Sequence, residues 1–119
     1  MHIFKGIDFT DSFVLSWNAN ETEIIFKIEA SLWPESPYYL QPKSNEYTCY
    51  RKCEIKFTGF TSYSGLIEQS LITPTIDTDG SLDYGNIDSL TKTNQGFKVM
   101  GEFGKLEIIN GKVQVQFYT

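Results

Sequence analysis

The C-terminal stretch 97–118 constrains the fold more than any other part of the sequence. Apolar and polar residues alternate along it almost without a break, which is the pattern of a strand with one buried face. The dipeptide Asn110-Gly111 interrupts the pattern, and these residue types suit the two positive-φ positions of a type I′ turn. The stretch therefore predicts a β-hairpin with strands over 97–103 and 113–118 and a tight turn at Asn110-Gly111. An isolated hairpin is marginally stable in water, so other strands must cover its apolar face.

Several earlier segments alternate in the same way. We expect a strand over 13–17 with its odd-numbered residues facing the core, and a longer one over 23–32 with its even-numbered residues facing the core. A further strand is expected over 47–60, and residues 84–90 should pair with the C-terminal hairpin. Segment 61–75 is compatible with one or two helical turns or with an edge strand.

About seven short strands, tight turns and little helix are typical of an antiparallel all-β domain, either a β-sandwich or a partly open barrel. The sequence does not separate these two architectures, although we favour the sandwich. We expect one β-rich domain over residues 1–119, which is long enough to bury roughly two-thirds of the surface of the unfolded chain.

Composition argues against two classes of partner. The net charge of -5 disfavours nucleic acid, because phosphate contacts need a basic surface. The sequence has no apolar run of about 18 residues, so we expect no membrane span. Its first residues lack the apolar region of a secretory signal, which predicts a cytoplasmic location.

The scarcity of histidine disfavours nucleophilic and metal-based catalysis. His2 is the one histidine, so neither a Ser-His-Asp nor a Cys-His pair can form without it. Cys49 and Cys53 lie four positions apart in an expected strand, which separates their Cα atoms by about 13 Å, beyond the disulfide limit of about 7 Å. We therefore expect two reduced, buried thiols, and no zinc site, phosphate-binding loop or cofactor.

The acidic run 77–83 has the composition of a calcium loop without its spacing. When Gly80 takes the sixth position of an EF-hand loop, Thr75 falls at the first and Asn86 at the twelfth, where acidic ligands are needed. An Asx-type turn is the ordinary interpretation, so we expect no metal there.

Carboxylates offer the remaining route to an enzyme. Three glutamates could meet across strands and act as acid and base, namely Glu54, Glu102 and Glu107. Exposed glutamates are common on strands, however, so we expect no enzymatic activity.

A Pro-rich loop over 33–42 is the first candidate binding surface. It contains three of the four prolines and the aromatic residues Trp33, Tyr38 and Tyr39. Proline cannot donate to a strand ladder, and loops with exposed aromatic side chains are common binding elements. The alternative is that these aromatic side chains fold back and cap one end of the core.

An acidic stretch is the second candidate. No lysine or arginine occurs between Lys56 and Lys92, whereas five carboxylates do, namely Glu68, Asp77, Asp79, Asp83 and Asp88. Such a stretch is either a solvated face that keeps the protein soluble or a patch that attracts a basic partner protein.

Three stretches carry a resemblance: residues 11–17 (DSFVLSW), 83–90 (DYGNIDSL) and 101–108 (GEFGKLEI). They resemble a group of small, uncharacterised bacterial β-rich proteins, some of which are thought to be immunity proteins of polymorphic toxin systems. The resemblance covers both ends of the chain and leaves residues 33–75 without a counterpart. It implies a bacterial, non-enzymatic binding protein and assigns no functional residue.

Together these features predict a non-enzymatic protein-binding module, in one form an immunity-type inhibitor of a basic partner protein. The predicted binding residues are those of the two candidate surfaces, Trp33, Tyr38, Tyr39, Asp77, Asp79, Asp83 and Asp88. One alternative is a barrel or sandwich that holds a small apolar ligand. The other is a hydrolase that uses carboxylates alone.

Overall fold

The computed structural model describes residues 1–42, 44 and 48–118. In this part the chain forms eight strands and two short 3-10 helices. In chain order they are η1 (His2–Phe4), β1 (Ile7–Ala19), β2 (Glu23–Leu32), β3 (Cys49–Leu66), η2 (Gln69–Leu71), β4 (Thr75–Ile76), β5 (Leu82–Asp83), β6 (Ile87–Lys92), β7 (Gly96–Gly101) and β8 (Gly104–Phe117). None of the described helices is long and apolar enough to cross a membrane.

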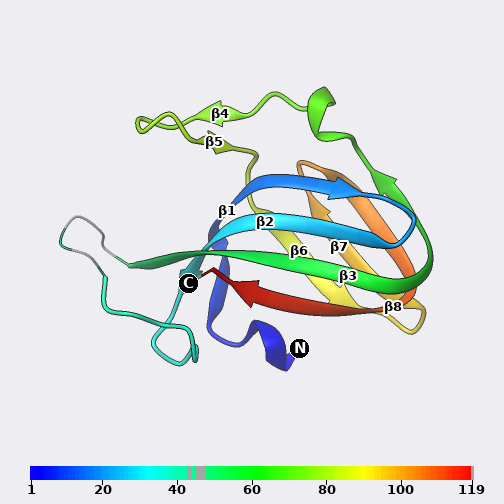
Figure 1. The fold of residues 1–119 in the computed structure, drawn as a ribbon, viewed down its shortest axis with the longest axis horizontal. Helices are drawn as coiled ribbons and strands as arrows, with labels where there is room; N and C mark the ends of the chain where they lie inside the picture. Colours follow the sequence, from blue (N-terminus) through cyan, green and yellow to red (C-terminus); the bar gives the residue numbers. More distant parts are fainter. Residues whose placement is uncertain (43, 45–47, 119) are drawn as a thin grey trace.

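Six strands form one antiparallel sheet in the order β1-β2-β3-β8-β7-β6, and β4 and β5 form a separate two-stranded ribbon. The large sheet curls into a half-barrel (Figure 1). Val14 of the outer strand β1 binds the chain just before the other outer strand, β6: its N–H donates to the Gly85 carbonyl at 2.8 Å, and its carbonyl accepts from the Tyr84 N–H at 2.9 Å. The predicted all-β antiparallel fold is confirmed, and of the two proposed architectures the partly open barrel describes it.

The concave face of the sheet holds the core. All five even-numbered residues of β2 are buried, as its alternation predicted, and they meet the inward side chains of β3, β7 and β8. Aromatic rings occupy the centre. The rings of Phe26 and Phe103 lie 4.7 Å apart, and those of Phe57 and Phe97 lie 5.3 Å apart. Phe26, Phe57 and Phe103 have no exposed surface.

The predicted turn at Asn110-Gly111 is wrong, because β8 runs straight through both residues. The chain reverses instead between Gly101 and Gly104. Asn110 and Gly111 do adopt positive φ angles, 63° and 95°, and Asn110 borders a register shift at which Thr61 is an extra residue of β3. Type I′ turns and some irregularities within strands both use positive φ, so the dipeptide predicts the backbone angles at this point but not whether the chain reverses there. Here it bends a long strand instead of ending a short one.

The predicted inward face of the first strand is wrong for Phe13 and Leu15 and right for Trp17. Val14 pairs with Ile28 and Ser16 pairs with Lys27, so Leu15 is an extra residue that has no partner in the ladder. This irregularity switches the strand from one face to the other. Val14 and Trp17 are consequently buried, whereas Phe13 and Leu15 are half-buried.

Strand β3 matches its prediction in its buried face and exceeds it in length. Cys49 and Cys53 lie in this strand as buried, free cysteines, as expected. Tyr47, the expected first residue, lies outside the described residues. Gly59 adopts a φ of 69°, yet the strand continues beyond it to Leu66. Segment 61–75 therefore holds the end of β3, the helix η2 and the first residue of β4.

Candidate functional site

Residues 67–85, which make up the connection from β3 to β6 except its last residue, are the most distinctive part of the surface, and we call them the acidic arm. It contains η2, β4 and β5, and its ribbon projects beside β1 on the side of the molecule opposite β8 (Figure 1). The ribbon has two residue pairs, Thr75 with Asp83 and Ile76 with Leu82. Its turn is closed by the Asp77 N–H, which donates to the Ser81 carbonyl at 2.9 Å. The acidic run thus forms the predicted turn.

The root of the acidic arm is fixed by Trp17 of β1. The indole Nε1–H of Trp17 donates to the Ile67 carbonyl at 2.8 Å, and its backbone N–H donates to Oε1 of Gln69 at 2.8 Å. Nε2 of Gln69 donates to the hydroxyl of Tyr84 at 3.3 Å. The rings of Trp17 and Tyr84 meet edge to face at 5.1 Å. These contacts and the two backbone hydrogen bonds of Val14 with Tyr84 and Gly85 place the arm. The ribbon itself has no buried side chain.

The tip of the acidic arm combines apolar side chains with carboxylates. Leu71, in η2 near the root, is 74% exposed, and Ile76 and Leu82 of the ribbon are 69% and 41% exposed. Asp77 and Asp79 beside them are exposed, and neither carboxylate is in an ion pair within the described residues. The hydroxyl and the N–H of Ser81 donate to Asp79 at 2.6 and 2.9 Å, which lowers the pKa of Asp79.

The other two predicted acidic residues lie closer to the half-barrel. Oδ1 of Asp83 accepts a hydrogen bond from the N–H of Gly85 at 2.7 Å, so this side chain helps to shape the return of the arm. Asp88 is an exposed residue of β6 and lies outside the arm. The structure therefore gathers three of the four predicted aspartates, Asp77, Asp79 and Asp83, on one element.

Of the aromatic side chains in the predicted binding loop, two are exposed and one packs against the core. Trp33 is 48% exposed; its backbone N–H donates to the Gly6 carbonyl at 2.8 Å, and its carbonyl accepts from the Ser36 N–H at 2.9 Å. Tyr38 is 42% exposed although its ring stacks on that of Phe117 at 4.3 Å. Tyr39 is half-buried and packs against the core. The loop leaves the opposite side of the sheet from the acidic arm, so the two candidate surfaces do not form one site (Figure 1).

A cleft beside the root of the acidic arm was not anticipated from the sequence. Its volume is about 430 Å³, and its walls include Trp17, Tyr63, Leu66, Ile67 and Gln69. It lies between the ends of β1 and β3 and the helix η2. The sequence could not indicate it, because the expected strands ended at residues 17 and 60 and the path of the connection was open.

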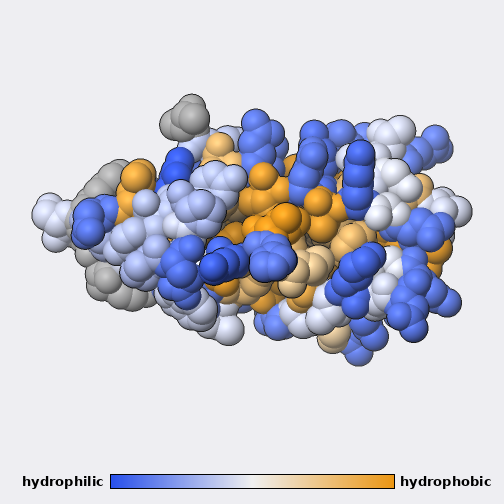
Figure 2. Space-filling model, turned by 90° about the horizontal axis from the view of Figure 1, so that it is seen from below, coloured by the Kyte–Doolittle hydropathy of each residue, from blue (hydrophilic) through white to orange (hydrophobic). Residues whose placement is uncertain are grey.

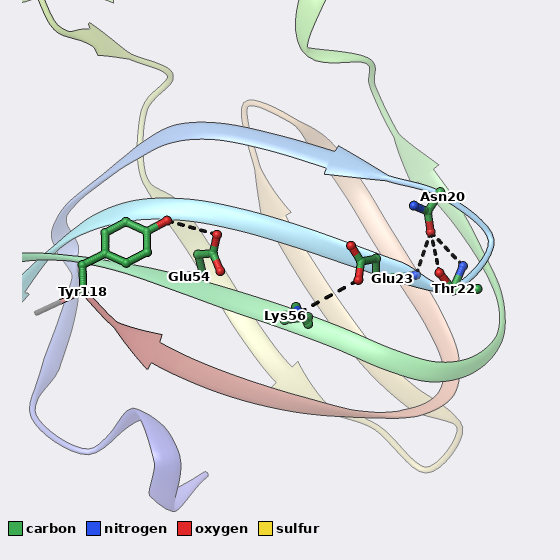
Figure 3. A network of polar contacts seen from close by, with 6 residues as sticks. All are labelled: Asn20, Thr22, Glu23, Glu54, Lys56 and Tyr118. Atoms are coloured by element: carbon green, nitrogen blue, oxygen red, sulfur yellow. Dashed lines mark hydrogen bonds and ion pairs between the residues drawn. The ribbon is translucent and has the colours of Figure 1, made fainter.

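The three glutamates considered for catalysis do not converge. Glu54 accepts a hydrogen bond from the Tyr118 hydroxyl at 3.0 Å on the outer face of the front strands (Figure 3). Glu107 pairs with Lys98 at 3.9 Å on the far side of the bend in β8. Glu102 lies in the turn between β7 and β8. Figure 3 also shows that the same outer face carries an ion pair between Lys56 and Glu23, which is a structural contact on an open surface.

The two thiols are poorly suited to act as nucleophiles. Burial raises the pKa of Cys53 to about 12, so its reactive thiolate form is scarce at neutral pH. Cys49 is also buried, and its sulfur accepts the N–H of Leu40 at 3.4 Å. Among the described residues, no three His, Cys, Asp or Glu side chains are grouped closely enough to hold a metal ion.

Comparison of the chain with models of protein families, with curated proteins and with solved structures found no match. Arguments about function therefore rest on the geometry of the acidic arm, the aromatic loop and the cleft.

Proposed function

We propose that this chain is a non-enzymatic protein-binding module whose acidic arm docks on a basic surface of a partner protein. The observation that carries the proposal is the exposure of Leu71, Ile76 and Leu82 on the same arm as Asp77 and Asp79. Interfaces typically join an apolar centre to a polar rim, and apolar patches left in water mark interaction surfaces. An immunity-type inhibitor, the class that the sequence resemblance implies, would be one form of such a module.

The two kinds of side chain have different roles in this proposal. Apolar anchors that lose water on binding mainly slow dissociation. Carboxylates at the rim mainly speed association, and salt weakens their effect. The fixed root at Trp17 limits how far the arm must order itself on binding, which lowers the entropic cost.

The test compares matched baits in a lysate of the source organism. Wild type, Ile76→Ser and the pair Asp77→Asn with Asp79→Asn are immobilised, and proteins retained by wild type are identified and purified. We expect Ile76→Ser to dissociate about ten times faster, and the paired change to associate more slowly at low ionic strength. A partner that all three baits bind with the same rates would show that the arm is not the docking surface.

Trp33→Ala serves in the same assay as a probe of the aromatic loop. Its ring is half-exposed and makes no ring contact within the described residues, so truncation should leave the fold intact. Faster dissociation would add Trp33 and its neighbours Tyr38 and Tyr39 to the interface. Unchanged rates would restrict the interface to the acidic arm.

The cleft beside Trp17 favours a second candidate function, the binding of a small, mainly apolar ligand. Its volume of about 430 Å³ falls in the range of small-molecule sites, and it combines aromatic walls with the polar groups of Gln69. Trp17 reports on the cleft by its fluorescence once Trp33 has been changed to Phe. Titration of this variant with a panel of small aromatic and aliphatic compounds should then shift the emission, and Leu66→Phe should weaken the shift because it narrows the cleft without adding a second tryptophan.

A further inference from the structure

The second half of β8 leaves one of its edges free. β8 pairs with β7 only over residues 104–109, and from Lys112 to Phe117 its one neighbouring strand among the described residues is β3. The N–H of Tyr118 donates to the Lys52 carbonyl at 3.1 Å. Since successive residues of an antiparallel strand point their N–H and C=O groups to alternate sides, those of Val113, Val115 and Phe117 point away from β3. Such an edge can accept a further extended segment.

Two hollows lie along this free edge, and together we call them the edge groove. One has a volume of about 290 Å³ between η1, Tyr38 and Val115, and the other about 360 Å³ between η1, Phe97 and Val113. Met1 and Ile3 beside them are 48% and 44% exposed. Figure 2 shows this side of the molecule, where hydrophobic surface occupies the middle of the view and hydrophilic side chains surround it.

The charges around the edge groove are positive. Lys5, Lys92 and Lys112 are exposed residues of its walls, and no carboxylate is among the described residues that form them. None of the three ammonium groups is in an ion pair within the described part of the chain. The edge groove is therefore an apolar floor with unpaired cations at its rim. The tip of the acidic arm has the complementary character, with exposed Ile76 and Leu82 beside unpaired carboxylates.

We propose that the acidic arm of one copy of this chain docks in the edge groove of a second copy. Ile76 and Leu82 would cover the apolar floor, and Asp77 and Asp79 would lie against the lysines of the rim. The inference rests on the proposed function, because it names a partner for the same arm. Charge favours the arm over the edge of a second β8, since pairing two such edges would bring like-charged lysine rims together.

The placement of the two surfaces determines the kind of assembly. The acidic arm projects beside β1, and the edge groove lies beside β8 at the other side of the half-barrel (Figure 1). An arm therefore reaches a groove only in another molecule, and each bound molecule still offers one arm and one groove. Contacts of this head-to-tail type extend into rings or chains instead of stopping at a two-fold dimer.

The first test measures the mass of the purified chain by sedimentation as its concentration rises at low ionic strength. The mass should increase beyond that of a dimer and return to that of the 13.6 kDa monomer at high salt. A chain that stays monomeric up to about 1 mM overturns the proposal, because the affinity would then be weaker than that of any specific contact of this size.

Two variants separate the sides of the contact. In the groove variant, Lys92→Glu with Lys112→Glu, the rim repels the arm. In the arm variant, Asp77→Asn with Asp79→Asn, the turn keeps its acceptor oxygen but loses its charge. Each variant alone should be monomeric. A mixture should form a complex that stops at one copy of each, because the arm of the groove variant fits the groove of the arm variant and neither free end can extend.

A charge-matched control excludes a general effect of charge. Lys27→Glu with Lys105→Glu makes the same change in net charge at exposed residues that are not part of the edge groove. This control should associate like wild type. Association that survives in the groove variant, or a mixture that stays monomeric, overturns the proposal. Circular dichroism of every variant checks that the fold is kept.

The same variants distinguish failure of this inference from failure of the proposed function. The groove variant retains the whole acidic arm, so it should still bind a basic partner protein captured by the wild-type bait. Loss of self-association with retained partner binding in the arm variant would contradict the proposed function alone. Partner binding that needs the arm, from a chain that never self-associates, would contradict the present inference alone.

Discussion

In the half-barrel, the large side chains Phe26, Phe57 and Phe103 have no exposed surface, whereas in the acidic arm Leu71, Ile76 and Leu82 keep between 41% and 74% of theirs. Neighbouring strands of the half-barrel pair over long ladders, such as that between β2 and β3, whereas β4 and β5 of the arm share two residue pairs. Removal of apolar surface from water is the main stabilising term in folding. The difference implies that the half-barrel supplies the stability of the chain, while the arm depends on its root and remains free for contacts with other molecules.

The largest expected effect contrasts one core residue with one arm residue. Phe26→Ala should lower the free energy of unfolding by about 3–5 kcal/mol, because it leaves a cavity at the centre of the aromatic cluster. Leu71→Ala should change it by less than about 0.5 kcal/mol, because its side chain is already in water. Urea denaturation measures both. A large loss of stability in Leu71→Ala would show that the arm belongs to the cooperative core.

A second contrast uses two glycines with positive φ, one in each region. A Cβ added to Gly111 of β8 would lie 2.8 Å from the Thr58 carbonyl, whereas one added to Gly80 of the arm would meet nothing within 4 Å. Both changes to alanine strain the backbone, by roughly 1–2 kcal/mol. We expect Gly111→Ala to cost at least this amount in unfolding free energy and Gly80→Ala to cost less, because the isolated ribbon can rearrange without disturbing the half-barrel. Equal losses would indicate that the ribbon and the half-barrel unfold together.

A substitution at the root of the acidic arm should have an effect on stability between that of a core substitution and that of a substitution in the ribbon. Gln69→Leu removes the acceptor of the Trp17 N–H, so an unpaired donor costs about 1–3 kcal/mol where it stays buried. The amide protons of residues 67–85 should then exchange with solvent faster than they do in the wild type, whereas those of β2 should not change, as measured by hydrogen exchange. Gln69→Glu is the matched control, since it keeps the acceptor oxygen. Unchanged exchange in Gln69→Leu would mean that the remaining contacts of the root, those of the indole and of Val14, are enough to hold the arm.

The smallest expected effect is a titration within the arm. Donation from Ser81 holds the pKa of Asp79 below its ordinary value. Because the pKa is lower in the folded than in the unfolded chain, this contact contributes stability above the ordinary pKa of aspartate and loses it as the pH falls through the folded value. NMR titration should show the lowered pKa, and Ser81→Ala should raise it. The carboxylate is fully exposed, so we expect no measurable change in the melting temperature of the half-barrel.

Within the half-barrel, the sequence predicted some strands correctly and others not. The alternation in residues 23–32 predicted both the limits of β2 and its buried face, because pairing on both sides leaves no choice of register. In β1 the alternation did not predict the buried face correctly, because the strand turns its other face inward at the extra residue Leu15. It also failed at Asn110-Gly111, because positive φ is shared by turns and bulges and only the distant partner β3 decides between them.

The candidate surfaces were predictable in part. Unbroken acidic composition indicated Asp77, Asp79 and Asp83, since a segment without cations cannot neutralise them locally. The exposed Leu71, Ile76 and Leu82 gave no signal, because an apolar residue in a sequence is ordinarily expected inside. The edge groove needed the observed order of strands, since nothing in residues 112–117 shows that only one of their two edges is covered.

Strands β3 and β8 lie in the middle of the six-stranded sheet, and β8 bends at Asn110 and Gly111. This central pair therefore joins one wall of the half-barrel, β1 and β2, to the other, β7 and β6. Residues that meet along these two strands are far apart in the chain; Glu54 and Tyr118, which share a hydrogen bond, are separated by 64 positions. A loop of that length must close before the walls can join, and folding rates fall as contacts become less local. The β1–β2 and β6–β7 hairpins can form early, but neither wall is complete without the shared pair. The chain should therefore fold slowly, with the meeting of β3 and β8 as the step that sets its rate.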